Sequence, residues 1–291
     1  MPDTRVLIDN LGFPEDPRWH DGALWFSDMD LKAVLRSDTS GRVTEVLSVD
    51  GIPSGLGWLP DGSLLVVSMS DRRLLQLGTS GASQFADLSA LAGFRCNDMV
   101  VDDLGRAYIG TFGFDFEAME PFAPGQIILV SPGGPPRIVA DGLAFPNGLA
   151  VTPDKKILIA SETLAERLTA FEIAADGSLG NQRVWAHLPG MTPDGISLDS
   201  QGAVWVASPV SSAVFRIREG GKILQKVSVR NQAYACRLGG PDGRTLYIAT
   251  SYALPSLFAL RGLPAPPTQA QHELLGRIET APVEVPGAGF P

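Results

Sequence analysis

The amino-acid sequence predicts an all-β protein, a six-bladed β-propeller, and three observations lead to that prediction. Six short segments share one pattern, in which two apolar runs flank a turn that is mostly rich in Asp and Gly. The chain contains 32 glycines and 23 prolines among 291 residues, more than a helical bundle tolerates but suited to short strands joined by turns. Apolar residues make up 44% of the chain, enough for a substantial core.

The six repeats are spread along the chain at a regular spacing. Each is a candidate hairpin, because both of its runs are about four to six residues of β-branched, leucine or aromatic character. The hairpins are expected at 15–28, 54–68, 97–111, 147–161, 194–208 and 236–251. The turns of successive hairpins are 40 to 50 residues apart, which is the length of one propeller blade.

Further strand-like runs fill the intervals between the hairpins. They are found at 33–38, 43–49, 73–78, 126–132, 136–140, 168–173, 183–188, 213–218 and 223–229. Together with the hairpins they make about four strands per unit, as in a propeller blade. We therefore expect a single propeller domain over residues 1–291, with the two terminal segments sharing one blade.

The segment 112–125, FGFDFEAMEPFAPG, matches no strand and lengthens the third interval. It carries three acids, four aromatic residues and two prolines. This composition is typical of a loop over an opening, so the segment is a candidate lid. A surface excursion without a role is the alternative.

Charge and composition exclude several kinds of partner. The net charge of −9 offers no basic surplus to displace the counterions of nucleic acid. No apolar run approaches the roughly 20 residues of a membrane-spanning helix, and the first ten residues do not read as a secretory signal. We expect a cytoplasmic protein whose partner is a small molecule; the oligomeric state stays open.

The cysteines and histidines point away from disulfides and zinc. Cys96 and Cys236 lie 140 residues apart and are expected to stay reduced. Two cysteines are too few for a cysteine-rich zinc site, and the histidines, His20, His187 and His272, are not grouped in a ligand pattern. Trp25 and Trp205 occupy equivalent strand positions and are expected in the core between blades.

One position recurs at the start of the first strand of every hairpin. It is occupied by Glu15, Ser54, Asn97, Asn147, Asp194 and Cys236. The first strand of a propeller blade is the innermost, so these residues are expected to converge on the central channel. Four of the six carry carboxylate or amide oxygens.

Four oxygen donors in a narrow channel predict a divalent metal ion. Two carboxylates there would repel each other unless a cation lay between them. Ca²⁺ accepts such a set with water or substrate completing its 6–8 oxygens, and Zn²⁺, Mn²⁺ or Mg²⁺ are alternatives. The competing interpretation is that Asn and Asp at these positions only form turns, which is less able to explain their common register.

The same residues carry a resemblance to the SMP-30/gluconolactonase/LRE-like family, also called the regucalcin family. The matching motifs are Glu15-Asp16-Pro17-Arg18-Trp19, Arg95-Cys96-Asn97-Asp98, Pro146-Asn147-Gly148-Leu149 and Pro193-Asp194-Gly195. They occur in the family's order, and the similarity runs from about residue 11 to 252. Two features depart from the family: Asp16 stands where it usually has glycine, and the segment 112–125 is rich in Phe where sugar-binding relatives are more polar.

The resemblance implies a six-bladed propeller with one catalytic divalent metal and activity toward sugar lactones. Glu15, Asn147 and Asp194 match the metal ligands, with Asn97 close to the metal. Arg95 and Asn97 match the substrate-binding pair, and Asp194 matches the catalytic proton acceptor. A substrate-binding acid in the loop after the third hairpin corresponds to Asp115, with Glu117 as a rival.

We therefore expect a divalent-metal-dependent hydrolase that opens the ester bond of a sugar lactone or a similar small lactone. A serine hydrolase lacks support, because the chain contains no G-x-S-x-G motif. The alternatives are a metal-dependent hydrolase of another ester or a phosphoester, and a non-catalytic calcium-binding propeller, since the fold alone implies no activity.

Overall fold

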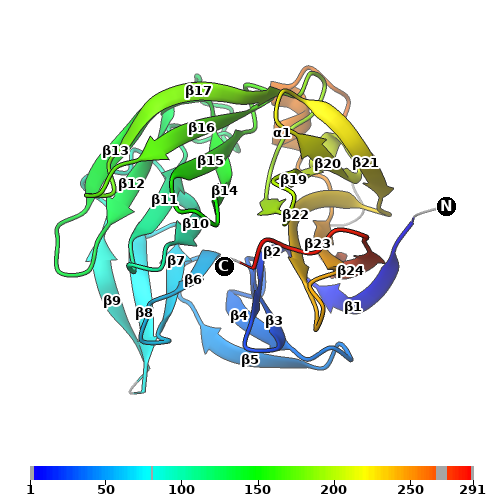
Figure 1. The fold of residues 1–291 in the computed structure, drawn as a ribbon, viewed down its shortest axis with the longest axis horizontal. Helices are drawn as coiled ribbons and strands as arrows, with labels where there is room; N and C mark the ends of the chain where they lie inside the picture. The colour runs from blue at the N-terminus through cyan, green and yellow to red at the C-terminus, as the bar shows by residue number, and fades with distance from the viewer. Residues whose placement is uncertain (1–2, 80, 267–273, 290–291) are drawn as a thin grey trace.

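A computed structural model of the chain describes residues 3–79, 81–266 and 274–289; His272 therefore lies outside the described residues. Six four-stranded antiparallel sheets surround a central axis as the blades of a propeller (Figure 1). The helical elements of the described residues are η1 (Pro209–Ser211) and α1 (Pro255–Leu260). No helix in this part of the chain is long and apolar enough to cross a membrane. The predicted fold class is confirmed.

Each blade runs from an inner strand to an outer one. Blade 1 is β2 (Pro14–His20), β3 (Ala23–Asp28), β4 (Ala33–Ser37) and β5 (Val43–Ser48); blade 2 is β6 (Pro53–Trp58), β7 (Leu64–Ser68), β8 (Arg73–Gly78) and β9 (Gly81–Asp87). Blade 3 is β10 (Cys96–Val101), β11 (Ala107–Thr111), β12 (Gly125–Val130) and β13 (Arg137–Leu143); blade 4 is β14 (Pro146–Val151), β15 (Ile157–Glu162), β16 (Arg167–Ile173) and β17 (Leu179–His187). Blade 5 is β18 (Ile196–Leu198), β19 (Val204–Ser208), β20 (Ala213–Arg218) and β21 (Lys222–Ser228).

Blade 6 closes the ring with both ends of the chain. Its order is β22 (Gln232–Gly239), β23 (Thr245–Ser251), β24 (Gly276–Pro282) and then β1 (Arg5–Leu11) as the outermost strand. The blade shared by the two termini was predicted. The strand β9, the helix α1 and the bounds of β24 were not. The β9 sequence is GASQFAD, whose small polar residues carry little strand signal, and the strand forms because β8 offers a pairing edge.

Glycines allow the inner strands to approach one another at the axis. A Cβ on Gly148 would lie 2.6 Å from the backbone oxygen of Asp194, and one on Gly55 would lie 2.5 Å from the backbone nitrogen of Met99. The Asn-Gly and Asp-Gly pairs therefore serve close strand packing, not turns alone. Each pair aligns an oxygen-bearing side chain with a glycine that lets the neighbouring blade come close.

Apolar side chains fill the spaces between adjacent blades. Trp205 is fully buried against Val214 and Leu246, as predicted. Trp25 is only partly buried: it meets the Trp58 ring edge-on and lies under the Arg36 guanidinium, so its placement in the core was wrong. Cys96 and Cys236 are buried free thiols, as expected.

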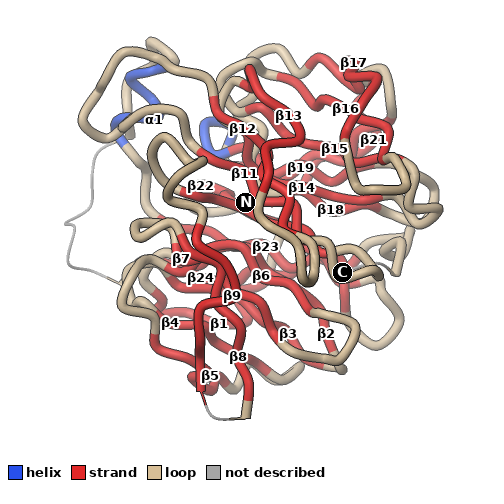
Figure 2. Tube along the Cα trace, turned by 90° about the vertical axis from the view of Figure 1, so that its left-hand side faces the viewer, coloured by secondary structure: helices blue, strands red, loops and turns tan. Residues whose placement is uncertain are grey.

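The chain's last described segment covers one end of the channel. Ser200 donates a backbone hydrogen bond to Pro286, and Gly287 donates one to Gly243, both in or beside turns at the far ends of inner strands. Figure 2 shows α1 toward the left-hand face of the disc and this carboxyl end toward the right-hand face. The starts of the inner strands, where the candidate ligands lie, are at the opposite end of those strands.

The closure of the ring predicts that one β1 side chain contributes strongly to stability. Leu11 is 4% exposed and packs in the core between blades 6 and 1, whereas Val6 on the same strand is 36% exposed. Leu11→Ala should lower the free energy of unfolding by about 2–4 kcal/mol, and Val6→Ala by less than about 1 kcal/mol. Urea titration followed by tryptophan fluorescence measures both; equal losses would contradict this role for β1.

Candidate functional site

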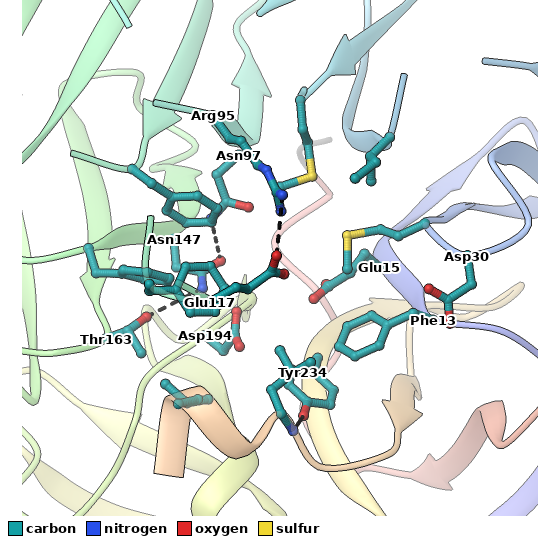
Figure 3. A pocket seen from close by; sticks show the side chains of 18 of the residues that line it. Phe13, Glu15, Asp30, Arg95, Asn97, Glu117, Asn147, Thr163, Asp194 and Tyr234 are labelled. Atoms are coloured by element: carbon teal, nitrogen blue, oxygen red, sulfur yellow. Dashed lines mark hydrogen bonds and ion pairs between the residues drawn. The ribbon is translucent and has the colours of Figure 1, made fainter. Parts of the chain in front are cut away.

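Four of the six register residues gather at one end of the channel. Glu15 lies near the start of β2, Asn97 of β10 and Asn147 of β14, while Asp194 lies two residues before β18. Their exposed fractions are 9%, 6%, 7% and 4% in that order. Figure 3 shows these side chains directed into one cavity.

The other two register positions do not reach the cavity. The backbone oxygen of Ser54 accepts a hydrogen bond from the Ser27 hydroxyl, and the Cys236 thiol contacts the backbone oxygens of Gly195 and Trp205. The expectation that all six side chains line one volume was therefore wrong for blades 2 and 6. Their small side chains fill spaces between inner strands instead.

Hydrogen bonds hold the four donors in a fixed arrangement. Asn97 Nδ2 donates to Asn147 Oδ1 at 3.0 Å, and Asn147 Nδ2 donates to Thr163 Oγ1 at 3.3 Å. Thr163 in turn donates to the backbone oxygen of Pro193 at 2.8 Å, beside Asp194. The amides of blades 3 and 4 are thus tied to the backbone of blade 5.

The loop before Glu15 is held by a second carboxylate. Both backbone N–H groups of Gly12 and Phe13 donate to Asp28 at the end of β3, at 2.8 and 3.0 Å. The backbone N–H of Asp16 donates to Glu15 Oε2 at 3.3 Å. Asp28 therefore orients the entry to β2 and, through it, the Glu15 carboxylate.

The two carboxylates of the site lie in a strongly unfavourable environment for negative charge. Burial raises the pKa of Glu15 well above its usual value, and the charges of Asp194 and Asp98 raise it further. Burial also raises the pKa of Asp194, with Asp98 adding to the effect. No cation is among the groups that shift either pKa in the described structure.

A separate group of buried charges lies next to these carboxylates. Arg18 Nη2 is 2.6 Å from Asp16 Oδ1, and Asp16 also accepts the backbone N–H of Leu56. Burial raises the pKa of Asp98 to about 8 and lowers that of Arg237 to about 9. Neither Arg18 nor Arg237 is among the groups that shift the pKa of Glu15 or Asp194.

Asp16 departs from the family's glycine at a position where backbone geometry favours glycine. Its φ is +43°, a left-handed conformation that Asp tolerates better than most residues. Its carboxylate is directed to Arg18 and to the Leu56 N–H, away from the donor cluster. Arg18 pairs with this extra negative charge, which still contributes to the raised pKa of Glu15.

The donor set fits a divalent cation. Two carboxylates and two amides supply hard oxygen ligands, and Asn147 Oδ1 retains a lone pair beyond the one that accepts from Asn97. Among the described residues, no group of three or more His, Cys, Asp or Glu is arranged to hold a metal. An ion at this site would therefore depend on the amide oxygens of Asn97 and Asn147 as well as on the two carboxylates.

The predicted substrate-binding residues lie at different distances from the cavity. Arg95 and Glu117 both line it, and Arg95 Nη2 is 3.2 Å from Glu117 Oε2. Asp115 is not among the lining residues: its Oδ1 accepts the backbone N–H groups of Glu117 and Ala118 and shapes the loop. Of the two rival acids, the geometry therefore favours Glu117 as the one that faces a ligand.

The segment 112–125 forms part of the cavity wall. It contains no strand up to Gly125, as predicted, and Phe112 and Phe116 from it line the cavity. Phe112, Phe114 and Phe116 are buried against the core, so this loop is anchored by its aromatic side chains.

Several lining residues were missed, and the register contained a signal for some of them. Strand side chains alternate, so the residue two positions before each register residue points to the same side. These positions are Phe13, Ile52, Arg95, Phe145, Thr192 and Tyr234, and all but Thr192 line the cavity. By contrast, Asp30, Thr163 and Tyr252 come from loops and strand ends that the register does not reach.

Comparison with known proteins assigns the family. The model of the SMP-30/gluconolactonase/LRE-like region matches residues 13–252. A pentonolactonase of Haloferax volcanii is 26% identical over 260 residues, 86% of each chain, and a 6-deoxy-6-sulfogluconolactonase of Pseudomonas putida is 26% identical over 284 residues, 95% of this chain and 93% of the other. The solved structure of a calcium-binding protein, regucalcin, from Agrobacterium tumefaciens superposes with a TM-score of 0.78 at 23% identity, covering 100% of this chain and 97% of that one.

The matched region contains every motif on which the site depends. It begins at Phe13, before the first candidate ligand, and ends at Tyr252, after the last blade's second strand. Six blades surround the cavity in this chain, and blades 1, 3, 4 and 5 carry the four oxygen donors. The chain therefore belongs to the SMP-30/gluconolactonase/LRE-like family.

Proposed function

We propose that this protein is a divalent-metal-dependent lactonase, which hydrolyses the ester bond of a small lactone. The observation that carries the proposal is the pair of buried carboxylates, Glu15 and Asp194, converging with Asn97 and Asn147 at the floor of a cavity. The lactonases among the relatives support the reaction class. We take the lactones in the names of these relatives as the first substrates to test. A small-molecule partner and a cytoplasmic location are also part of the proposal.

Glu15, Asn147 and Asp194, with Asn97 beside them, are the residues that would hold the cation. Ca²⁺ is the first candidate because all donors are oxygens and because the regucalcin relative is described as calcium-binding. When bound, a divalent ion supplies Lewis acidity that polarises an ester carbonyl. Zn²⁺, Mn²⁺ and Mg²⁺ are the alternatives to be tested.

The remaining polar residues bind and orient the lactone. Arg95 and Glu117 stand at the partly exposed side of the cavity, with 23% and 50% of their side chains exposed, where they can contact ring or substituent oxygens. Asn97 lines the same cavity as this pair and the two carboxylates. Holding the ester group beside a fixed proton acceptor raises the effective concentration of the reacting groups.

Asp194 is the proposed proton acceptor for the attacking water. Burial raises its pKa, which makes the free carboxylate a stronger base than an ordinary aspartate. Coordination to a cation opposes that effect, since it stabilises the charged form. Substitutions of Asp194 can therefore separate its role as a metal ligand from its role as a base.

Removal of the metal should abolish lactone opening. We expect an excess of EDTA, followed by desalting, to reduce turnover of a lactone panel at least 100-fold, because nothing else compensates the charges of Glu15 and Asp194. Proton release measures turnover, and elemental analysis measures the bound metal. Restoration of turnover by one of Ca²⁺, Zn²⁺, Mn²⁺ or Mg²⁺ identifies the working ion.

Turnover that survives complete metal removal would refute metal dependence. Metal binding without turnover of any lactone or ester would indicate a non-catalytic propeller.

Substitution of Asp194 should separate coordination from proton transfer. Asp194→Ala is expected to lose both metal binding and turnover, with kcat/KM lowered at least about 10³-fold. Asp194→Asn keeps one ligand oxygen, so at saturating metal it should bind the ion yet remain at least about 100-fold slower if the carboxylate is the base. Asp61→Ala, on an exposed turn of blade 2, is the control. Full activity in Asp194→Ala would end this assignment.

Glu117 and Asp115 should differ in their effect on substrate binding. Glu117→Gln removes the carboxylate that faces the cavity and should raise KM about tenfold, with a smaller effect on kcat. Asp115→Asn retains an oxygen that can accept the backbone N–H groups of the loop, so its KM should change less than about threefold. Steady-state kinetics on the same lactone measures both variants, and the reverse order would assign the role to Asp115.

A further inference from the structure

We infer that the preferred substrate is a lactone that carries an apolar substituent, such as a short alkyl chain, and not a polyhydroxylated sugar lactone. The inference rests on the proposed lactonase function and specifies the substrate class of the same cavity. It is carried by the wall of the cavity above the oxygen donors.

Three phenylalanines form one side of that wall. The rings of Phe112 and Phe145 stack with centroids 4.3 Å apart, and Phe116 meets them edge-on at 5.6 and 5.1 Å. We call these three residues the phenylalanine wall. The remaining apolar lining residues come from other blades and from the α1 region: Phe13, Met29, Ile52, Met69, Leu254 and Leu257. A ligand above the carboxylates therefore meets carbon on most sides.

One of these rings, that of Phe145, is held by a residue with an unfavourable backbone conformation. Phe145 has a φ of +64°, a left-handed conformation that is unfavourable for a bulky residue. Such strain persists where the surrounding structure imposes it, commonly beside a functional site. Phe145 is two residues from Asn147 and lines the same cavity, so the strained residue places an aromatic ring in the cavity that also contains the candidate ligands.

The polar groups of the wall already have partners within the protein. The Tyr252 hydroxyl donates to Asp30 at 3.1 Å, and the Tyr234 hydroxyl donates to the backbone oxygen of Tyr252 at 2.7 Å. The Thr163 hydroxyl is used by Pro193, as described above. Arg95 and Glu117 can bind only some of the oxygens of a sugar lactone, so its other hydroxyls would face carbon, and each unpaired hydroxyl weakens binding.

The size of the cavity limits the substituent. Its volume is about 140 Å³. An engineered apolar cavity of about 150 Å³ in another protein accommodates benzene. The residues that line this cavity include the four oxygen donors of the floor, so the space must hold the lactone ring itself and leaves room for a substituent of only a few carbons.

A matched panel of lactones tests the inference. γ-Octalactone and γ-phenyl-γ-butyrolactone carry apolar substituents, γ-butyrolactone carries none, and glucono-δ-lactone carries hydroxyls. In each reaction water adds to the acyl carbon, the acyl–oxygen bond of the ring breaks, and a hydroxy acid forms with release of one proton. Each buried methylene is worth about fourfold in affinity, so we expect kcat/KM for γ-octalactone to exceed that for γ-butyrolactone by at least 20-fold.

The panel separates the two levels of the proposal. Equal or faster opening of glucono-δ-lactone would overturn the apolar preference while leaving the lactonase proposal intact. No turnover of any lactone in the presence of metal would refute the lactonase function itself. Binding of 2-butylcyclopentanone and cyclopentanone, which have no ester bond, can then be compared by calorimetry: at least tenfold tighter binding of the butyl compound is expected, and equal binding would overturn the inference without any reference to catalysis.

Substitutions within one loop test the phenylalanine wall. Phe116→Ala should reduce the ratio of kcat/KM for γ-octalactone over γ-butyrolactone at least fivefold. Phe122→Ala is the matched control, because Phe122 lies in the same loop, is 55% exposed and does not line the cavity. Phe116→Leu, which retains much of the apolar volume, should restore most of the ratio. An unchanged ratio in a folded Phe116→Ala protein would overturn the assignment, and the calorimetric comparison on the unaltered protein decides the matter if that variant does not fold.

Discussion

The close approach of the inner strands at the axis is the constraint on which the rest of the structure depends. Glycines at Gly55, Gly148 and Gly195 allow neighbouring blades to come closer than any Cβ would permit. That approach buries the side chains at the starts of these strands and brings carboxylates from blades 1 and 5 into one small volume. Burial disfavours both charges there and raises the pKa of both carboxyl groups; in the proposed function a divalent cation compensates them.

The cavity has two chemically different parts, and each has its own structural origin. The floor consists of oxygen donors from the inner strands and is held by hydrogen bonds between blades. The wall consists mainly of apolar side chains from the segment before each inner strand, from the long loop of blade 3 and from the α1 region. In the proposed function, reaction chemistry and substrate choice therefore lie in different segments of the chain.

Sequence reasoning reached the floor of this cavity but only part of the wall. Glu15, Asn97, Asn147 and Asp194 were found because they share one register position in a visible repeat, and strands convert register into spatial proximity. The choice between Asp115 and Glu117 could not be made, because both lie in an irregular loop whose turns are set by its own hydrogen bonds. Trp25 shows a related limit: its strand position matches that of Trp205, yet it is only partly buried at the edge of the core between blades 1 and 2.

The sequence by itself determined the number of blades, their order, the mixing of the two termini in one blade and the oxygen donors at the strand starts. All of these follow from local periodicity, repeated turn residues and a constant spacing. Only the tertiary structure decided which register residues reach the cavity, that Arg18 pairs with Asp16, and that Phe145 lines the cavity from a left-handed backbone conformation. These features depend on contacts between blades that are distant in sequence, and a side chain's solvation and partners are set by those contacts, not by its neighbours along the chain.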